Sequence, residues 1–207
     1  MDTETTIRQD TSSRHLRKYN SKNPIQALTL KRFFDAVAKE ITHIEPERVL
    51  EFGCGEGFFI QELKKRNLKI KQLTGLDLRD DALQAAKELH PEYEFELADV
   101  MKWQKGNKYY DLVIASQVME HLIDPDQILA KLISFSSAHL LLTVPWEPWF
   151  RIMNLLRGRD ILRFGNHPEH VNHWRLSTFN KFLSPHVIIE KSYTIFPFII
   201  VKARVKN

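Results

Sequence analysis

The strongest indication of the fold is the stretch Val49-Leu50-Glu51-Phe52-Gly53-Cys54-Gly55-Glu56-Gly57-Phe58. It places a short apolar run before three alternate glycines, and an apolar pattern of helical spacing begins directly after them. Glycine permits a positive φ and lets the backbone approach a ligand without a Cβ in the way. An ordinary strand-to-helix turn would not need so many, because the chain has only seven glycines and three of them fall within five residues. We therefore predict a strand, a ligand-binding turn and a helix, in this order.

The spacing of the glycines indicates which kind of ligand the turn accepts. A pyrophosphate-binding turn of a dinucleotide fold has the pattern G-x-G-x-x-G, whereas the position three residues after Gly55 is Phe58. The acidic Glu51 also lies two residues before the first glycine. A carboxylate so close to the turn disfavours a pyrophosphate and favours a cationic ligand group. The spacing therefore argues against a nicotinamide-dinucleotide oxidoreductase.

Short apolar runs and helical patterns alternate along most of the chain. After a helical pattern over residues 25–44, five apolar runs begin 24, 22, 17 and 28 residues apart, which is the rhythm of βα units in a parallel sheet. The predicted strands are Arg48–Phe52, Gln72–Asp77, Glu94–Ala98, Asp111–Ala115 and His139–Val144. The predicted helices between them are Phe58–Arg66, Asp80–Leu89 and Pro125–Ser134. Two further β-rich runs, His186–Ser192 and Thr194–Val205, are close enough to pair as antiparallel neighbours.

The composition excludes several classes of protein. The chain has 207 residues, a net charge of +4 and one cysteine, Cys54, so an internal disulfide framework and a thiolate zinc site are ruled out. The longest apolar run, Ile195–Val201, is interrupted by Pro197 and is far shorter than the roughly 20 residues of a membrane span. The small positive charge favours anionic partners but does not by itself indicate nucleic-acid binding. The acidic, threonine-rich N-terminus does not resemble a secretory signal, so we expect a cytoplasmic protein. We expect no obligate protein partner.

Four motifs in order resemble those of class I S-adenosylmethionine-dependent methyltransferases, specifically the small-molecule type and its ubiquinone-pathway O-methyltransferase branch. The glycine turn is the first motif, Gly75-Leu76-Asp77-Leu78 is the second, and Leu97-Ala98-Asp99-Val100 is the third. The fourth runs from Tyr110 to Leu122. With the strand pattern, the resemblance implies an α/β fold: a Rossmann-like, seven-stranded, mostly parallel sheet with one antiparallel C-terminal strand and helices on both faces. Residues 1–23 are expected to be a mobile tail, and residues 24–207 a single domain with a helical cap at about residues 146–183.

The resemblance also implies the cofactor S-adenosyl-L-methionine and the residues that bind it. In that family the acid after the second strand accepts hydrogen bonds from the ribose hydroxyls, which corresponds to Asp77. The acid after the third strand contacts the adenine amino group, which corresponds to Asp99. An aspartate after a strand is often only a helix cap, but the order of these acids behind the glycine turn favours ligand binding. The predicted cofactor-binding residues are Glu51, Gly53, Cys54, Gly55, Gly57, Asp77, Leu78, Asp99, Val100, Ser116 and Gln117.

His121 ends the fourth motif and is the predicted catalytic residue. The acceptor is expected to approach there, and an imidazole is largely neutral at pH 7, so it can take a proton from the acceptor or orient it. Some relatives hold a divalent cation at this place with a Glu-x-x-Glu-His pattern. This sequence reads Gln117-Val118-Met119-Glu120-His121, and a neutral glutamine is a poor replacement for a charged hard ligand. We therefore predict no metal ion.

Three further histidines are evenly spaced at His167, His170 and His173. Even spacing of histidines is found in metal sites, but it also fits a polar loop that faces water, and the second interpretation is favoured. The same three residues are the alternative candidates for a catalytic base if His121 is not one.

The stretch from Trp146 to Phe164 bears on the acceptor. It interleaves aromatic and aliphatic side chains with Arg151, Arg157 and two further arginines. This composition suits a membrane interface, a lid over an apolar acceptor, or plain packing on the sheet. The first two interpretations predict a small, apolar or lipid-linked acceptor and a weak peripheral membrane contact through the cap.

Two other functions compete with this prediction. An RNA or protein methyltransferase is disfavoured because the chain has no dense basic run. A non-catalytic interaction protein that kept the fold is disfavoured because a scaffold needs neither the three glycines nor the two aspartates.

Overall fold

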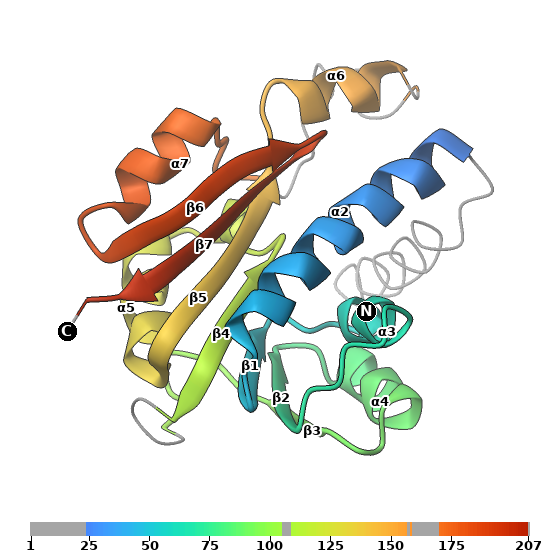
Figure 1. Cartoon of the computed structure of the whole chain (residues 1–207), viewed down its shortest axis with the longest axis vertical. Helices are drawn as coiled ribbons and strands as arrows, with labels where there is room; N and C mark the ends of the chain where they lie inside the picture. The colour runs from blue at the N-terminus through green and yellow to red at the C-terminus, as the bar shows by residue number, and fades with distance from the viewer. Residues whose placement is uncertain (1–23, 105–108, 157, 159–169, 207) are drawn as a thin grey trace, which may run out of the picture.

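The computed structural model describes residues 24–104, 109–156, 158 and 170–206, and the predicted tail lies outside the described residues. They form a seven-stranded sheet with the order β3-β2-β1-β4-β5-β7-β6 (Figure 1). The strands are β1 (Arg48–Phe52), β2 (Gln72–Asp77), β3 (Glu94–Leu97), β4 (Tyr110–Ser116), β5 (Ser136–Pro145), β6 (Val187–Ile195) and β7 (Phe198–Val205). The helices are α2 (Pro24–Ile44), α3 (Phe58–Lys64), α4 (Asp80–Leu89), α5 (Pro125–Phe135), α6 (Trp149–Leu156) and α7 (Leu176–Leu183), with a short 3-10 turn η1 (Met119–His121).

The strand directions confirm the predicted fold class. Strands β1 to β5 pair in parallel with their neighbours. Strand β7 lies between β5 and β6 and runs antiparallel to both, so the two C-terminal runs pair as the sequence predicts. Within the described ranges, no helix combines the length and the apolar character needed to cross a membrane.

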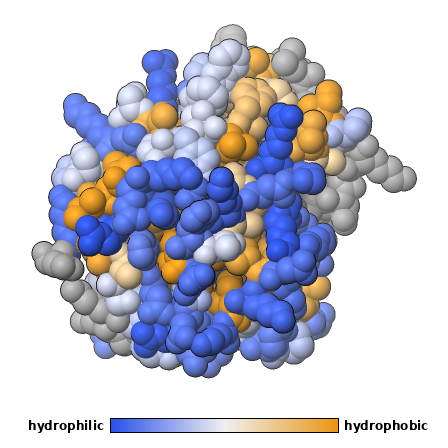
Figure 2. Space-filling view, in the orientation of Figure 1, coloured by the Kyte–Doolittle hydropathy of each residue, from blue (hydrophilic) through white to orange (hydrophobic). Residues whose placement is uncertain are grey.

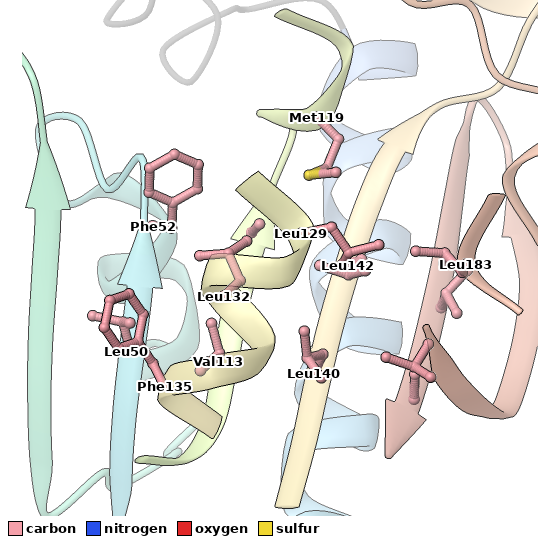
Figure 3. Packing of buried hydrophobic residues seen from close by; sticks show 14 of the residues in the cluster. Leu50, Phe52, Val113, Met119, Leu129, Leu132, Phe135, Leu140, Leu142 and Leu183 are labelled. Atoms are coloured by element: carbon pink, nitrogen blue, oxygen red, sulfur yellow. The ribbon is translucent and has the colours of Figure 1, made fainter. Parts of the chain in front are cut away.

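Helices cover both faces of the sheet because alternate strand residues are apolar on both sides. Leu50 of β1 and Val113 of β4 belong to the core that also contains Leu129 and Leu132 of α5 (Figure 3). Val49, the neighbour of Leu50, packs instead with the helices α2, α3 and α4 on the opposite face. The continuous apolar runs of the sequence are therefore strands that are buried on both faces.

Strand β5 is longer than predicted at its N-terminal end. The polar residues of Ser136-Ser137-Ala138 resemble a loop, yet the strand begins directly after α5. Ser136 is fully buried, and its hydroxyl donates to the carbonyl of His139 at 2.9 Å. This local bond satisfies the polar side chain inside the sheet, which the apolar pattern alone does not reveal.

The region predicted as a helical cap contains two helices in different places. Helix α6 lies near the turn between β6 and β7 (Figure 1). Helix α7 instead buries Phe179 and Leu183 in the core on the α5 face. These two residues lie four positions apart and so share one side of the helix. Helix α7 thus belongs to the layer that covers the sheet, while residues 157 and 159–169 lie outside the described part of the chain.

Candidate functional site

The turn between β1 and α3 lies at the edge where the parallel strands end. Gly53, Gly55 and Gly57 all have a positive φ, at 72°, 52° and 77°. The amides of Gly53 and Cys54 donate to the carbonyl oxygen of Leu76, at 2.8 and 3.1 Å. These bonds fix the turn against the end of β2. In open α/β sheets, ligands bind outside the carboxyl ends of the strands, so this turn is in the expected place for a binding site.

The three glycines of the turn meet different surroundings. A Cβ on Gly53 would lie 2.6 Å from Val118 Cγ2, and one on Gly57 would lie 2.9 Å from the ring of His90. Among the described residues, a Cβ on Gly55 would meet only the guanidinium of Arg79, at 3.6 Å. Packing thus requires glycine at positions 53 and 57, whereas Gly55 borders the open side of the turn. The backbone of Gly55 is the part of the turn that a ligand can approach.

Asp77 ends β2 and faces this turn. Its Oδ2 accepts a hydrogen bond from the amide of Gly55 at 2.8 Å, and its Oδ1 accepts one from the amide of Arg79 at 3.0 Å. The side chain of Arg79 donates to Glu56 at 3.4 Å, while its Nη1 is buried without a partner among the described residues. Sequence reasoning missed Arg79 and Glu56, because no motif or periodicity singles them out.

Glu51 is the second acid beneath the turn. Only 2% of the residue is exposed, and its Oε2 has no hydrogen-bond partner within the described ranges. Burial, and secondly the charge of Asp77, raise the pKa of the Glu51 carboxyl to about 8. An unpaired buried carboxylate is costly, so a cationic group that entered beside it would be stabilised.

The other predicted cofactor-binding residues differ in exposure. Asp99 follows β3, and its Oδ1 accepts a hydrogen bond from the amide of Met101 at 3.0 Å. Val100 is buried, whereas Leu78 is 71% exposed. The thiol of Cys54 packs in the core on the α2 face, and burial raises its pKa far above the usual range. Cys54 therefore contributes its backbone to the turn, and its thiol is not a nucleophile.

Ser116 and Gln117 direct their side chains toward β5. The hydroxyl of Ser116 lies 3.0 Å from Thr143 Oγ1, and the Gln117 side-chain amide donates to the same oxygen at 3.2 Å. Gln117 has a φ of 58°, which is uncommon for a residue with a side chain. Their backbone remains at the ligand edge, while their side chains stabilise the end of β4.

His121 lies in η1, beside a hollow of about 330 Å³. The hollow is mostly apolar and is lined by Met101, His121, Leu122, Ile123, Asp124, Gln127 and Ile128. It lies between the segment that follows Asp99 and the start of α5. A volume of this size is at the lower end for small-molecule sites.

A segment distant in sequence returns to η1 and brings His170 to His121. The amides of Val171 and Asn172 donate to the carbonyl of Glu120, both at 3.0 Å, and the Asn172 side chain donates to the carbonyls of Met119 and Leu122. The ring of His170 consequently lies 4.8 Å from that of His121.

The remaining two histidines of the evenly spaced set lie elsewhere. His173 Nδ1 lies 3.8 Å from Oε1 of Glu147, which follows β5. His167 lies outside the described residues.

Glu120, His121 and His170 form the one group in the described part of the chain that could hold a metal ion. Their ligand atoms lie within 4.8 Å of one another. The group offers two imidazoles and one carboxylate, and Glu120 Oε1 lies 3.9 Å from His121 Nε2. Gln117, where a fourth ligand would be needed, bonds Thr143 instead. The absence of a metal requirement stays a prediction.

Comparison with known proteins shows the family of the chain. Residues 19–184 match a protein family described as a methyltransferase domain. A malonyl-[acyl-carrier protein] O-methyltransferase of Halalkalibacterium halodurans is 28% identical over 151 residues, which cover 69% of this chain and 54% of that protein. A ubiquinone biosynthesis O-methyltransferase of Yersinia enterocolitica is 29% identical over 102 residues, or 46% of this chain and 40% of that protein. The chain spans about half the length of the curated relatives it matches.

A solved structure shares the whole fold. Magnesium protoporphyrin IX methyltransferase from Synechocystis, crystallised with bound SAH, aligns with a TM-score of 0.70 at 17% identity. The alignment covers 99% of this chain and 96% of that one. The glycine turn and the two aspartates thus stand on a scaffold that this protein shares with a known methyltransferase.

Proposed function

The chain belongs to the methyltransferase domain family, and from that premise we propose that it transfers a methyl group from S-adenosyl-L-methionine to a small acceptor. One observation carries the proposal: the buried carboxylate of Glu51, whose Oε2 has no partner among the described residues, lies beneath a turn whose Gly55 borders open space. The cofactor bears a positively charged amino group and sulfonium. Two acids, Glu51 and Asp77, suit this charge and do not suit a pyrophosphate.

The residues present fit the cofactor along one edge of the sheet. Asp77, which the Gly55 and Arg79 amides hold in place, would accept hydrogen bonds from the ribose hydroxyls. Asp99 and the apolar hollow beside Met101 would hold the adenine. When bound, the cofactor supplies an activated methyl group on sulfur. The chain contributes alignment and exclusion of water, which can supply roughly 7–11 kcal/mol in favourable cases.

His121 is the proposed acceptor-side residue. It lies on the rim of the hollow and next to His170. A group at this place can take the acceptor proton or orient the acceptor toward the methyl group.

We place the acceptor among apolar or lipid-linked molecules. Trp149, Ile152 and Leu155 of α6 are exposed, and Phe196 of the neighbouring turn lies 6.2 Å from Trp149. Hydrophobic surface interrupts the hydrophilic surface around the top of the molecule, where α6 lies (Figure 2). Such side chains suit a weak peripheral contact with a membrane that holds the acceptor.

The acceptor class is tested by a product screen. The protein is incubated with S-adenosyl-L-methionine and with the aqueous or the organic fraction of a cell extract, and mass spectrometry detects compounds that gain one methyl group. We expect a methylated product in the organic fraction, absent with Asp77→Ala. A product found only in the aqueous fraction would contradict the apolar acceptor but not the methyl transfer.

Membrane contact is tested separately by co-sedimentation with anionic phosphatidylglycerol vesicles at low salt. We expect the protein to pellet with the vesicles and Trp149→Ala to pellet less. A protein that stays in the supernatant would exclude the membrane contact.

A further inference from the structure

Glu147 is a buried acid at the ligand edge that the sequence did not single out. It lies two residues beyond the end of β5 and is only 6% exposed. The Arg151 amide and the His173 ring are the donors that act on its carboxylate and oppose the rise in pKa that burial causes, yet neither oxygen has a partner at full hydrogen-bond geometry within the described residues. Its backbone is fixed, since the Glu147 amide donates to the carbonyl of Trp174 at 2.9 Å. A buried carboxylate that is held in one place and incompletely bonded calls for a partner that completes it.

His173 is the nearest ionisable partner of this carboxylate. Its Nδ1 lies 3.8 Å from Glu147 Oε1, and the two nitrogens of an imidazole point in divergent directions. Nε2 is therefore turned away from Glu147, and the side chain as a whole is 38% exposed. A carboxylate that faces one ring nitrogen while the other faces the reactant is the arrangement of a histidine base.

The segment that carries His173 is fixed relative to η1. Asn172, its chain neighbour, donates to the carbonyls of Met119 and Leu122 at 3.2 and 2.6 Å. His173 and His121 thus belong to one edge of the sheet, on two segments that are bonded to each other. Arg151 and His173 are the charged groups that act on Glu147, and both oppose the rise in pKa that burial causes.

We propose that His173, oriented by Glu147, takes the proton of an acceptor hydroxyl, and that the pair selects hydroxyl acceptors over carboxylates. The inference rests on the proposed methyl transfer. The hydroxyl oxygen forms a bond to the methyl carbon, the bond between that carbon and sulfur breaks, and its electron pair stays on sulfur. The hydroxyl proton goes to His173 Nε2, and Glu147 stabilises the imidazolium at Nδ1. His121 then orients the acceptor.

A carboxylate acceptor does not fit this pair. It has no proton to give, and its charge would repel that of Glu147. Glu147 is a positioning residue, and His173 is the catalytic one.

The binding test uses the full chain saturated with S-adenosylhomocysteine and two probes, p-cresol and p-toluate. Both probes have the same methyl-substituted ring, which matches the aromatic pair of Phe150 and His170 stacked at 5.2 Å on these two segments. The imidazole signals are followed by NMR. We expect p-cresol to shift the His173 signals at least several-fold more than p-toluate does. An equal or larger shift with p-toluate, or no shift with either probe, overturns the inference. A protein that does not bind S-adenosylhomocysteine contradicts the proposed function instead.

The second measurement separates orientation from a structural role. The His173 ring signals are followed by NMR in the S-adenosylhomocysteine-saturated wild-type chain and in Glu147→Gln, which keeps the shape and removes the charge. We expect p-cresol to shift the His173 signals several-fold less in the variant, because the carboxylate that orients the ring is gone. His186, which lies 3.4 Å from Asp126 and is not part of this edge, provides the control: its signals stay the same in both proteins. An equal p-cresol shift of His173 in a folded variant overturns the pairing.

Discussion

The amide of Gly55 donates a hydrogen bond to the carboxylate of Asp77 at 2.8 Å. The bond joins the turn after β1 to the end of β2. The strands β1 and β2 also pair in parallel. A second bond, from the Arg79 amide, holds the other oxygen of Asp77. The carboxylate is thus fixed before a ligand arrives, which reduces the entropy that binding costs.

Gly55→Val is expected to weaken the binding of S-adenosylhomocysteine at least tenfold. The branched side chain would fill the open side of the turn, where the ligand should approach. The positive φ of 52° adds backbone strain of about 1–2 kcal/mol. Gly158→Val is the matched control, because Gly158 has a φ of 67° and a Cβ there would meet no atom of the described residues within 4 Å. Isothermal titration calorimetry should show normal affinity in the control. Equal affinity in both variants would exclude a ligand at Gly55.

Glu51 should make the ligand-free protein less stable as the pH rises. The unfolded carboxyl ionises near 4.5, whereas the pKa of the folded one is raised to about 8. Between these values the folded state holds a proton that the unfolded state has lost, so stability falls by at most about 1.4 kcal/mol per pH unit. Glu51→Gln removes this dependence.

Thermal unfolding from about pH 5 to about pH 8 measures the effect of Glu51. The wild type should lose stability relative to Glu51→Gln across this range. Parallel curves for the two proteins would show that Glu51 is not a buried, protonated carboxyl.

His121→Ala is expected to lower turnover about 10²-fold while the affinity for S-adenosylhomocysteine stays the same. The imidazole lies on the rim of the hollow, and we propose that it contacts the acceptor, so its loss should affect the acceptor only. Turnover is followed as S-adenosylhomocysteine release with the acceptor found in the product screen. Full turnover in this variant would remove His121 from the acceptor site.

Chelation of divalent cations should leave turnover unchanged. Glu120, His121 and His170 are the three grouped ligands among the described residues, and the neutral Gln117 side chain, which stands where a fourth would be needed, bonds Thr143 instead of joining them. The test compares turnover before and after treatment with EDTA, followed by addition of manganese or zinc. A loss with EDTA that a metal restores would show that the three residues close around an ion.

The sequence predicts the sheet well because the central strands, such as β1 and β4, are short apolar runs that stand out from the turns and helices around them. It also predicts the local part of the site, since Glu51, Asp77 and Asp99 each follow from their position at the end of a strand. The bond between Gly55 and Asp77 shows that these local features meet in space.

Contacts between distant segments could not be predicted. His170 reaches His121 only because Asn172 is bonded to η1, and no periodicity encodes this bond. Glu147 lies beside His173 for the same reason, because the segment that carries His173 is bonded to η1 through Asn172. Position 57 requires glycine because the ring of His90, the residue that follows α4, packs against it. Such contacts follow from tertiary packing, so the sequence pattern of one element does not contain them.

Cofactor binding at Asp77 is measured by a calorimetric titration of S-adenosylhomocysteine into the wild-type chain and into Asp77→Ala. Asp77 should accept bonds from the ribose hydroxyls, and each bond to a charged group contributes roughly 1.5–3 kcal/mol. We predict saturable binding to the wild type and at least about tenfold weaker binding to a folded Asp77→Ala. The absence of binding to the wild type, or equal affinity in the two proteins, would contradict a cofactor site at this edge of the sheet.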